Sequence, residues 1–123
     1  MATARILIVE DNPLNLKLVR DVLTVSGYEV VAAPSGEEGV TLAQTCAPDL
    51  VLMDIQLPGI DGYEATRRIR AVPALAAVPI IAVTSYALSG DEAKTRAAGC
   101  DGYVAKPFSP RQLLAKIREF LPE

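Results

Sequence analysis

Four apolar runs in this sequence each end in residues that can do chemistry. Glu10 and Asp11 follow the run ILIV, Asp54 follows LVLM, Thr84 follows IIAV and Lys106 follows GYVA. Three carboxylates, one hydroxyl and one ammonium, gathered in one place, can bind a divalent cation and hold a phosphoryl group. These residues span nearly a hundred positions. The chemistry therefore requires a fold that brings the ends of the four runs together.

The alternation of strand and helix patterns along the chain predicts such a fold. Apolar runs rich in Val and Ile are typical of buried parallel strands, and the helical patterns between them favour an α/β sheet covered on both faces. In an open parallel sheet the carboxyl ends of the strands meet in one crevice, where ligands bind. We predict five strands, over residues 5–10, 29–33, 49–54, 79–84 and 102–105.

Local signals mark where the predicted helices begin and end. A serine followed three residues later by Glu or Gln is typical of a capping box, and three such pairs occur: Ser35 with Glu38, Ser89 with Glu92, and Ser109 with Gln112. Pro13 and Pro110 suit the first position of a helix, and Gly27 and Gly99 suit helix ends. The helix predicted over residues 13–26 is nearly all Leu and Val outside one polar stripe, so we expect the fold to cover most of it.

Composition excludes several classes of function. The chain has 123 residues, of which 50% are hydrophobic, and its net charge is −3. These values fit one globular domain over residues 1–123 and argue against nucleic-acid binding. No stretch is apolar enough to cross a membrane and no signal peptide is visible, so we expect a cytoplasmic protein. The absence of histidine excludes Ser-His-Asp catalysis and histidine zinc sites. Cys46 and Cys100 are expected to be packing residues.

The three acids favour a bound metal ion. At about 4 Å and an effective dielectric constant of about 20, each pair of like charges costs on the order of 4 kcal/mol. A Mg²⁺ ion, which prefers oxygen ligands, relieves this repulsion. The alternative is that Asp11 caps the first helix and Glu10 points into solvent.

Asp54 is the best candidate for a nucleophile, because a carboxylate can accept a phosphoryl group as an acyl phosphate. Lys106 would supply positive charge to the phosphoryl oxygens and Thr84 a hydroxyl donor. The peptide oxygen of Gln56 is close enough in sequence to be another metal ligand. The alternative for Lys106 is a solvated surface lysine, and the isomer of the Lys106–Pro107 bond stays open.

These residues and their order closely resemble the receiver domains of bacterial two-component response regulators. The resemblance covers the whole chain and rests on the acid pair EDN, on LMDIQLPGIDG, on AVTSYA and on the Lys-Pro pair. Within that family, the segments ILIVEDNPLNLKLV, PDLVLMDIQLP and GDEAKTRAAGCDGYVAKP are similar to the single-domain regulators of the DivK kind.

The resemblance implies a flavodoxin-like (CheY-like) doubly wound α/β fold. Its five parallel strands would have the order 2-1-3-4-5, with five helices. It also implies Mg²⁺-dependent phosphorylation, with Mn²⁺ as a substitute. In that family pattern the residues would have these roles: Asp54 as phosphoacceptor; Asp11, Asp54 and the Gln56 carbonyl as metal ligands, with Glu10 assisting through water; Thr84 and Lys106 as phosphoryl contacts; and Thr84 with Tyr103 as the switch pair. The residues alone predict only half-buried strand packing for Tyr103.

The implied activity is that of a switch, which catalyses only its own phosphorylation and slow dephosphorylation. Its partners would be a histidine kinase or histidine phosphotransfer protein and a downstream protein. Its output surface would be helix four, strand five and helix five. We expect no output domain, no nucleic acid, no membrane insertion, and a monomer or weak dimer. Two features depart from the common pattern: Ser85 stands where alanine is frequent, and Glu10 where aspartate is frequent.

Three other classes of protein fit less well. A Mg²⁺-dependent phosphohydrolase with an aspartyl-phosphate intermediate typically has a second Asp two residues after the nucleophile, where this chain has Gln56. A flavodoxin-like cofactor-binding protein needs a phosphate-binding loop after the first strand, where this chain has EDNPLN. A phosphate-independent pseudo-receiver usually lacks one of the key residues, and this chain keeps all of them.

Overall fold

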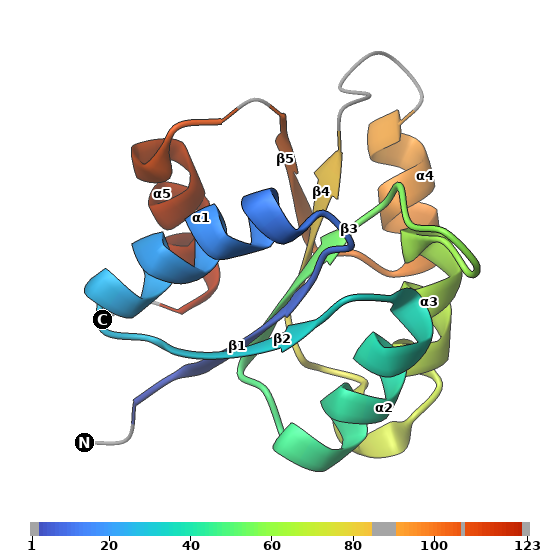
Figure 1. Cartoon of the computed structure of the whole chain (residues 1–123). Helices are drawn as coiled ribbons and strands as arrows, with labels where there is room; N and C mark the ends of the chain where they lie inside the picture. Colours follow the sequence, from blue (N-terminus) through green and yellow to red (C-terminus); the bar gives the residue numbers. More distant parts are fainter. Residues whose placement is uncertain (1–2, 85–90, 107, 122–123) are drawn as a thin grey trace.

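Five parallel strands form one sheet at the centre of the molecule (Figure 1). The computed structural model describes residues 3–84, 91–106 and 108–121. The strand order is β2-β1-β3-β4-β5, and each neighbouring pair is parallel. The order and the parallel pairing confirm the predicted CheY-like fold. The strands are β1 Arg5–Val9, β2 Glu29–Ala33, β3 Leu50–Asp54, β4 Ile80–Thr84 and β5 Gly102–Ala105.

Three strands are one residue shorter than predicted. Glu10 lies just after β1, although its N–H still donates to the carbonyl of Ala33. Asp49 and Pro79 lie just before β3 and β4. Pro79 has no N–H to donate to a neighbouring strand, which places it naturally at the boundary.

Helices cover both faces of the sheet (Figure 1). Successive strand residues point to opposite faces, so Ile6 and Ile8 of β1 pack on one side and Leu7 and Val9 on the other. The first side carries α1 (Pro13–Val25) and α5 (Pro110–Phe120). The second carries α2 (Gly36–Cys46), α3 (Gly62–Arg70) and α4 (Asp91–Ala98), with a short 3-10 turn over Pro73–Leu75. No helix in these described ranges is long and apolar enough to cross a membrane.

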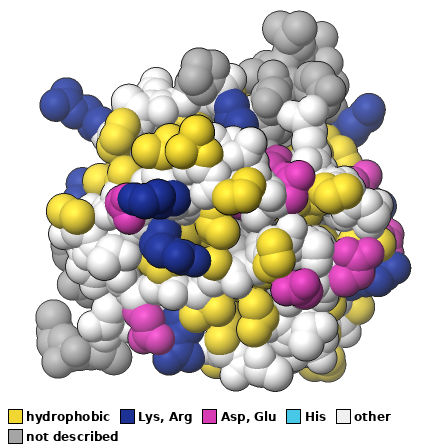
Figure 2. All heavy atoms as spheres, viewed as in Figure 1, with side chains coloured by type: hydrophobic (Ala, Val, Ile, Leu, Met, Phe, Trp, Pro, Cys, Tyr) yellow, Lys and Arg dark blue, Asp and Glu magenta, His cyan; other side chains and the backbone are white. Residues whose placement is uncertain are grey.

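The expectation that most of α1 is covered by the fold was wrong. Leu23 is fully buried, but Leu14, Leu18 and Val25 are 66%, 58% and 88% exposed. Hydrophobic side chains are accordingly visible at the surface on the side of the molecule that carries α1 (Figure 2). Outside its polar stripe, α1 is apolar at nearly every position. Only one face of the helix can pack on the sheet, so only some of its leucines and valines are buried.

The ends of the helices follow the predicted capping signals. Ser35 accepts a hydrogen bond from the N–H of Glu38, and Ser109 forms a reciprocal capping box with Gln112. Gly27 and Gly99 adopt the left-handed conformation at the ends of α1 and α4. The pair Ser89–Glu92 cannot be compared, because Ser89 and the side chain of Glu92 lie outside the described residues.

The capping box of α5 gives a test of local stability. Ser109→Ala removes the acceptor for the N–H of Gln112, and we expect it to lower the free energy of unfolding by about 1 kcal/mol. Urea unfolding would measure this change. Ser26→Ala is the matched control, since Ser26 is exposed and ends α1 through its backbone N–H, and it should change stability by less than about 0.5 kcal/mol. Equal effects of the two substitutions would contradict the role of the cap.

Candidate functional site

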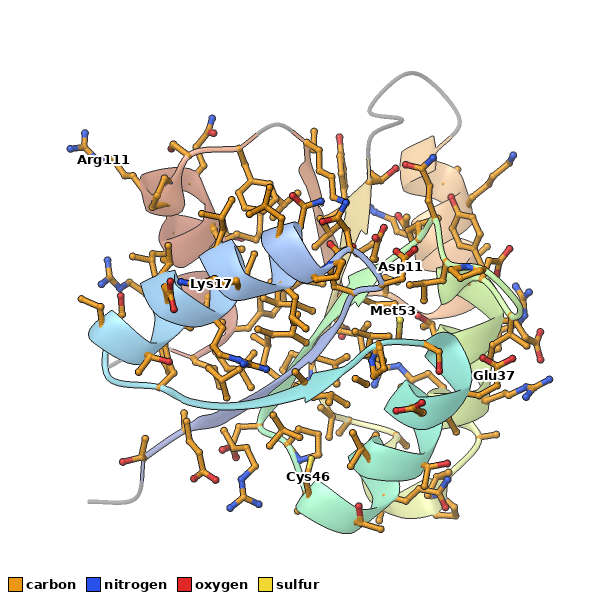
Figure 3. The ribbon with its side chains drawn as sticks, viewed as in Figure 1. Asp11, Lys17, Glu37, Cys46, Met53 and Arg111 are labelled. Atoms are coloured by element: carbon orange, nitrogen blue, oxygen red, sulfur yellow. The ribbon has the colours of Figure 1, made fainter. Side chains whose placement is uncertain are left out.

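Three carboxylates meet at the carboxyl edge of the sheet. Glu10 and Asp11 follow β1, and Asp54 ends the neighbouring strand β3. One oxygen of each of the three side chains lies within 4.8 Å of the others. Glu10 and Asp54 are only 6% and 3% exposed, whereas Asp11 is exposed and lies beside the end of β3 (Figure 3). The fold therefore gathers the three acids that the sequence singled out.

The structure rules out the alternative roles of Glu10 and Asp11. Asn12, not Asp11, caps α1, because its side-chain oxygen accepts hydrogen bonds from the N–H groups of Leu14 and Asn15. Glu10 does not point into solvent. Its Oε2 accepts a hydrogen bond from the N–H of Asn12 at 3.2 Å, and the residue is buried.

Lys106 brings a positive charge to the acids from the end of β5. Its Nζ lies 3.4 Å from Oδ2 of Asp54 and 3.5 Å from Oε1 of Glu10. Its side chain is 22% exposed, which argues against the alternative interpretation of Lys106 as a solvated surface lysine. The N–H of Lys106 also donates to the carbonyl of Thr84 at 2.7 Å, which fixes the start of the segment after β5 against the end of β4. Pro107, and with it the isomer of the Lys106–Pro107 bond, lies outside the described residues.

Burial, together with the neighbouring Asp54, changes the protonation of Glu10. Burial, followed by a side-chain hydrogen bond with Asp54, raises the pKa of Glu10 from 4.5 to about 7. The nearby ammonium of Lys106 acts in the opposite direction but does not cancel the shift. The raised pKa brings the protonation of Glu10 close to neutral pH.

The loop after Asp54 is held by backbone bonds and by α2. The N–H of Gln56 donates to Oδ1 of Asp54 at 3.0 Å, and the N–H of Gly62 donates to the carbonyl of Ile55 at 3.0 Å. Glu37 reaches this loop from α2, where its Oε2 accepts a hydrogen bond from the N–H of Ile60 at 3.4 Å (Figure 3). This contact of Glu37 could not be predicted from the sequence, because no local pattern connects Glu37 with a loop more than twenty positions away.

Thr84 and Tyr103 occupy the neighbouring strands β4 and β5. Thr84 is the last residue of β4, is fully buried, and pairs with Ala105 of β5. Tyr103 is half-buried and packs against the core cluster on the α2 and α3 side of the sheet. This confirms the half-buried packing predicted for Tyr103 from the residues alone. Ser85 lies outside the described residues.

The comparison with known families agrees with this geometry. The sequence model of the response regulator receiver domain matches residues 6–118. The chain belongs to this family. Among curated relatives of this receiver domain, the polar-differentiation response regulator DivK of Brucella ovis is 44% identical over 119 residues, which make up 97% of each chain. The predicted family and the similarity to DivK are both confirmed.

Solved structures show the same architecture. Chemotaxis protein CheY4 of Vibrio cholerae matches this receiver domain with a TM-score of 0.93 and 28% identity, covering 97% of this chain and 99% of the other. The receiver domain of the sensor histidine kinase PA1611 from Pseudomonas aeruginosa PAO1 matches with a TM-score of 0.92 and 40% identity, covering 99% and 100%. That second structure has a magnesium ion coordinated in its active site cleft.

Proposed function

We propose that this receiver domain is a phosphorylation-controlled switch, with Asp54 as the phosphoacceptor. The phosphoryl group would come from the phosphohistidine of a partner kinase or phosphotransfer protein. One observation carries the proposal: a buried carboxylate at the end of β3 lies within reach of two further acids and of the Lys106 ammonium. Membership of the receiver family and the similarity to DivK support it.

The reaction needs little chemistry beyond position and charge. An oxygen of Asp54 attacks the phosphorus atom, a new O–P bond forms, and the bond from phosphorus to the donor imidazole breaks with its electron pair left on the imidazole. Lys106, whose Nζ already lies beside Oδ2 of Asp54, stabilises the charge on the phosphoryl oxygens. The bond from the Gln56 N–H to Oδ1 holds the carboxylate in one orientation during the attack.

The acids fit a hard divalent cation. Their three carboxylate oxygens lie within 4.8 Å of one another, and oxygen ligands are those that Mg²⁺ prefers. We assign Asp11, Asp54 and the carbonyl of Gln56 as ligands, with Glu10 assisting through water. When bound, Mg²⁺ supplies positive charge that offsets the repulsion among these acids and the incoming phosphoryl group.

The switch would start at Thr84 and Tyr103. We assign the Thr84 hydroxyl to the phosphoryl group, and a change in the packing of Tyr103 to the response that follows. Tyr103 lies on β5, which contacts α4 and α5, and Thr84 ends the neighbouring strand β4. The surface formed by α4, β5 and α5 would therefore present the change to a downstream protein. Moving such an equilibrium from 1:99 to 99:1 takes about 5.5 kcal/mol, which requires several contacts acting together.

Intact mass spectrometry tests the proposal. The protein is incubated with acetyl phosphate with and without Mg²⁺, beside Asp54→Asn and the matched control Asp21→Asn, an exposed acid of α1. We expect a single phosphoryl adduct that requires Mg²⁺ and Asp54 and is unaffected in the control. No adduct with the donor intact would contradict the proposal. Donor consumed over many turnovers without a lasting adduct would indicate the phosphohydrolase instead.

Binding of Mg²⁺ should depend on pH through Glu10. Because the pKa of Glu10 is about 7 without metal, this acid is mostly protonated at lower pH and mostly charged at higher pH. We expect the apparent affinity for Mg²⁺ to rise with pH, by at most roughly tenfold per unit below pH 7, and to level off above it. Titrations followed by NMR at several pH values would measure this. Glu10→Gln should remove most of the pH dependence of Mg²⁺ affinity. If the Mg²⁺ affinity of the unmodified protein did not change with pH, the assignment of Glu10 to the metal site would be contradicted.

A further inference from the structure

A cavity lies between α1 and α5, over the sheet face that these helices cover. Its volume is about 710 Å³, within the range of small-molecule sites. Its lining is mainly apolar and includes Val22 of α1. Ile8 and Leu52 of the sheet and Leu113 of α5 also contribute, although they are only 3%, 2% and 1% exposed. Leu18 of α1 also lines it and is 58% exposed, so the cavity is open to solvent on the α1 side.

One end of this cavity reaches the acid site. Among the described residues, Glu10, Asp54 and Lys106 are the charged residues that line it. The exposed carboxylate of Asp11 lies within 4.8 Å of the other two acids, so three acidic groups surround one ammonium at this end. The Nζ of Lys106 is 3.4–3.5 Å from the two carboxylates, longer than the 2.7–2.9 Å typical of a charged hydrogen bond. A carboxylate can accept about four hydrogen bonds, so both acids keep capacity for a further donor.

We propose that this cavity binds a small organic cation whose apolar body lies between α1 and α5. Its ammonium or amidinium head would donate hydrogen bonds to Glu10 and Asp54. The charge at the end of the cavity selects a cation over an anion, and the apolar walls select an aryl or alkyl body over a hydrated ion. The site goes beyond the proposed phosphorylation and does not depend on it. Because the head and Mg²⁺ would use the same carboxylates, each should exclude the other.

The test uses phenylbutylamine as the probe and two matched compounds. The amine is titrated into ¹⁵N-labelled protein without metal, and the amide shifts of Val22 and Leu113 are followed by NMR. We expect saturable shifts with the amine and binding weaker by on the order of tenfold with phenylbutanol, which lacks the charge. Addition of Mg²⁺ should displace the amine. Equal binding of the alcohol, tighter binding of phenylbutyrate, or the absence of shifts would overturn the proposal.

Two exposed leucines of α1 provide matched variants. Leu18 lines the cavity, whereas Leu14, one turn earlier and 66% exposed, does not. Leu18→Arg places a competing cation at the opening and should weaken amine binding by on the order of tenfold, while Leu14→Arg should leave it unchanged. An equal effect of the two would overturn the assignment. No phosphodonor is present in these titrations, so their outcome is separate from that of the phosphorylation test.

Discussion

Replacement of Lys106 by methionine is expected to slow phosphorylation of Asp54 by acetyl phosphate about a hundredfold or more, while Mg²⁺ binds more tightly. The ammonium lies 3.4 Å from the carboxylate of Asp54, the proposed acceptor, so its loss would remove charge stabilisation during phosphoryl transfer. The same loss leaves the three carboxylates less neutralised, which favours a dication.

The two opposite changes make this prediction specific. A variant that merely misfolds would lose phosphorylation and metal affinity together. Rates come from intact mass at timed intervals, and metal affinity from NMR titration. Lys116→Met is the matched control, since Lys116 pairs with Glu119 on α5 and is not among the residues of the acid site, and it should change neither value. A Lys106→Met protein phosphorylated at the normal rate would contradict the assigned role.

Gly62→Ala is expected to destabilise the protein by about 2 kcal/mol or more. A Cβ at this position would lie 2.3 Å from the carbonyl oxygen of Asp54 and 2.6 Å from the Cα of Ile55, so the end of β3 would have to move. This cost outweighs the gain of about 1 kcal/mol that alanine normally brings to a helix. Because the moved segment carries Asp54, phosphorylation should slow as well.

Gly27 offers the contrasting control for this substitution. Its φ of 97° disfavours alanine, but no atom lies within 4 Å of the added Cβ. Gly27→Ala should therefore cost only about 1–2 kcal/mol and leave the phosphorylation rate of the folded protein unchanged. Urea unfolding measures the stability of each variant, and intact mass at timed intervals measures its phosphorylation rate. If Gly62→Ala were as stable as the unmodified protein, the close packing of α3 on the end of β3 would not constrain the site.

The sequence alone was sufficient to predict the helices and strands and the convergence of the three acids, because both depend on local patterns. The runs before Glu10 and Asp54 are apolar enough to identify as buried strands, and parallel strands share one carboxyl edge. Capping residues such as Ser109 act within a few positions, so helix starts could be predicted closely. The exposure of Leu18 could not, because an almost uniformly apolar helix gives no sign of which side faces the sheet.

Long-range polar contacts could not be predicted from the sequence either. Arg70 of α3 donates hydrogen bonds to the carbonyls of Gly99 and Val78 and pairs with Asp101, joining α3 to the turn before β5 and to the segment before β4. From the sequence alone, Arg70 is only one of several basic residues in the last turn of a helix. Its role depends on the distance between segments some thirty residues apart, which only the packed structure defines.

The order in which the site residues appear along the chain has a consequence for the newly made protein. Lys106 comes 52 residues after Asp54 and 96 after Glu10, so the ribosome releases all three acids long before their counter-charge. In a nascent chain that has paired β1 with β3, the repulsion among these carboxylates would not yet be offset by the ammonium of Lys106. In the proposed function, the acceptor site would be complete only when β5 joins the sheet, so Asp54 on an unfinished chain would lack the nearby charge of Lys106.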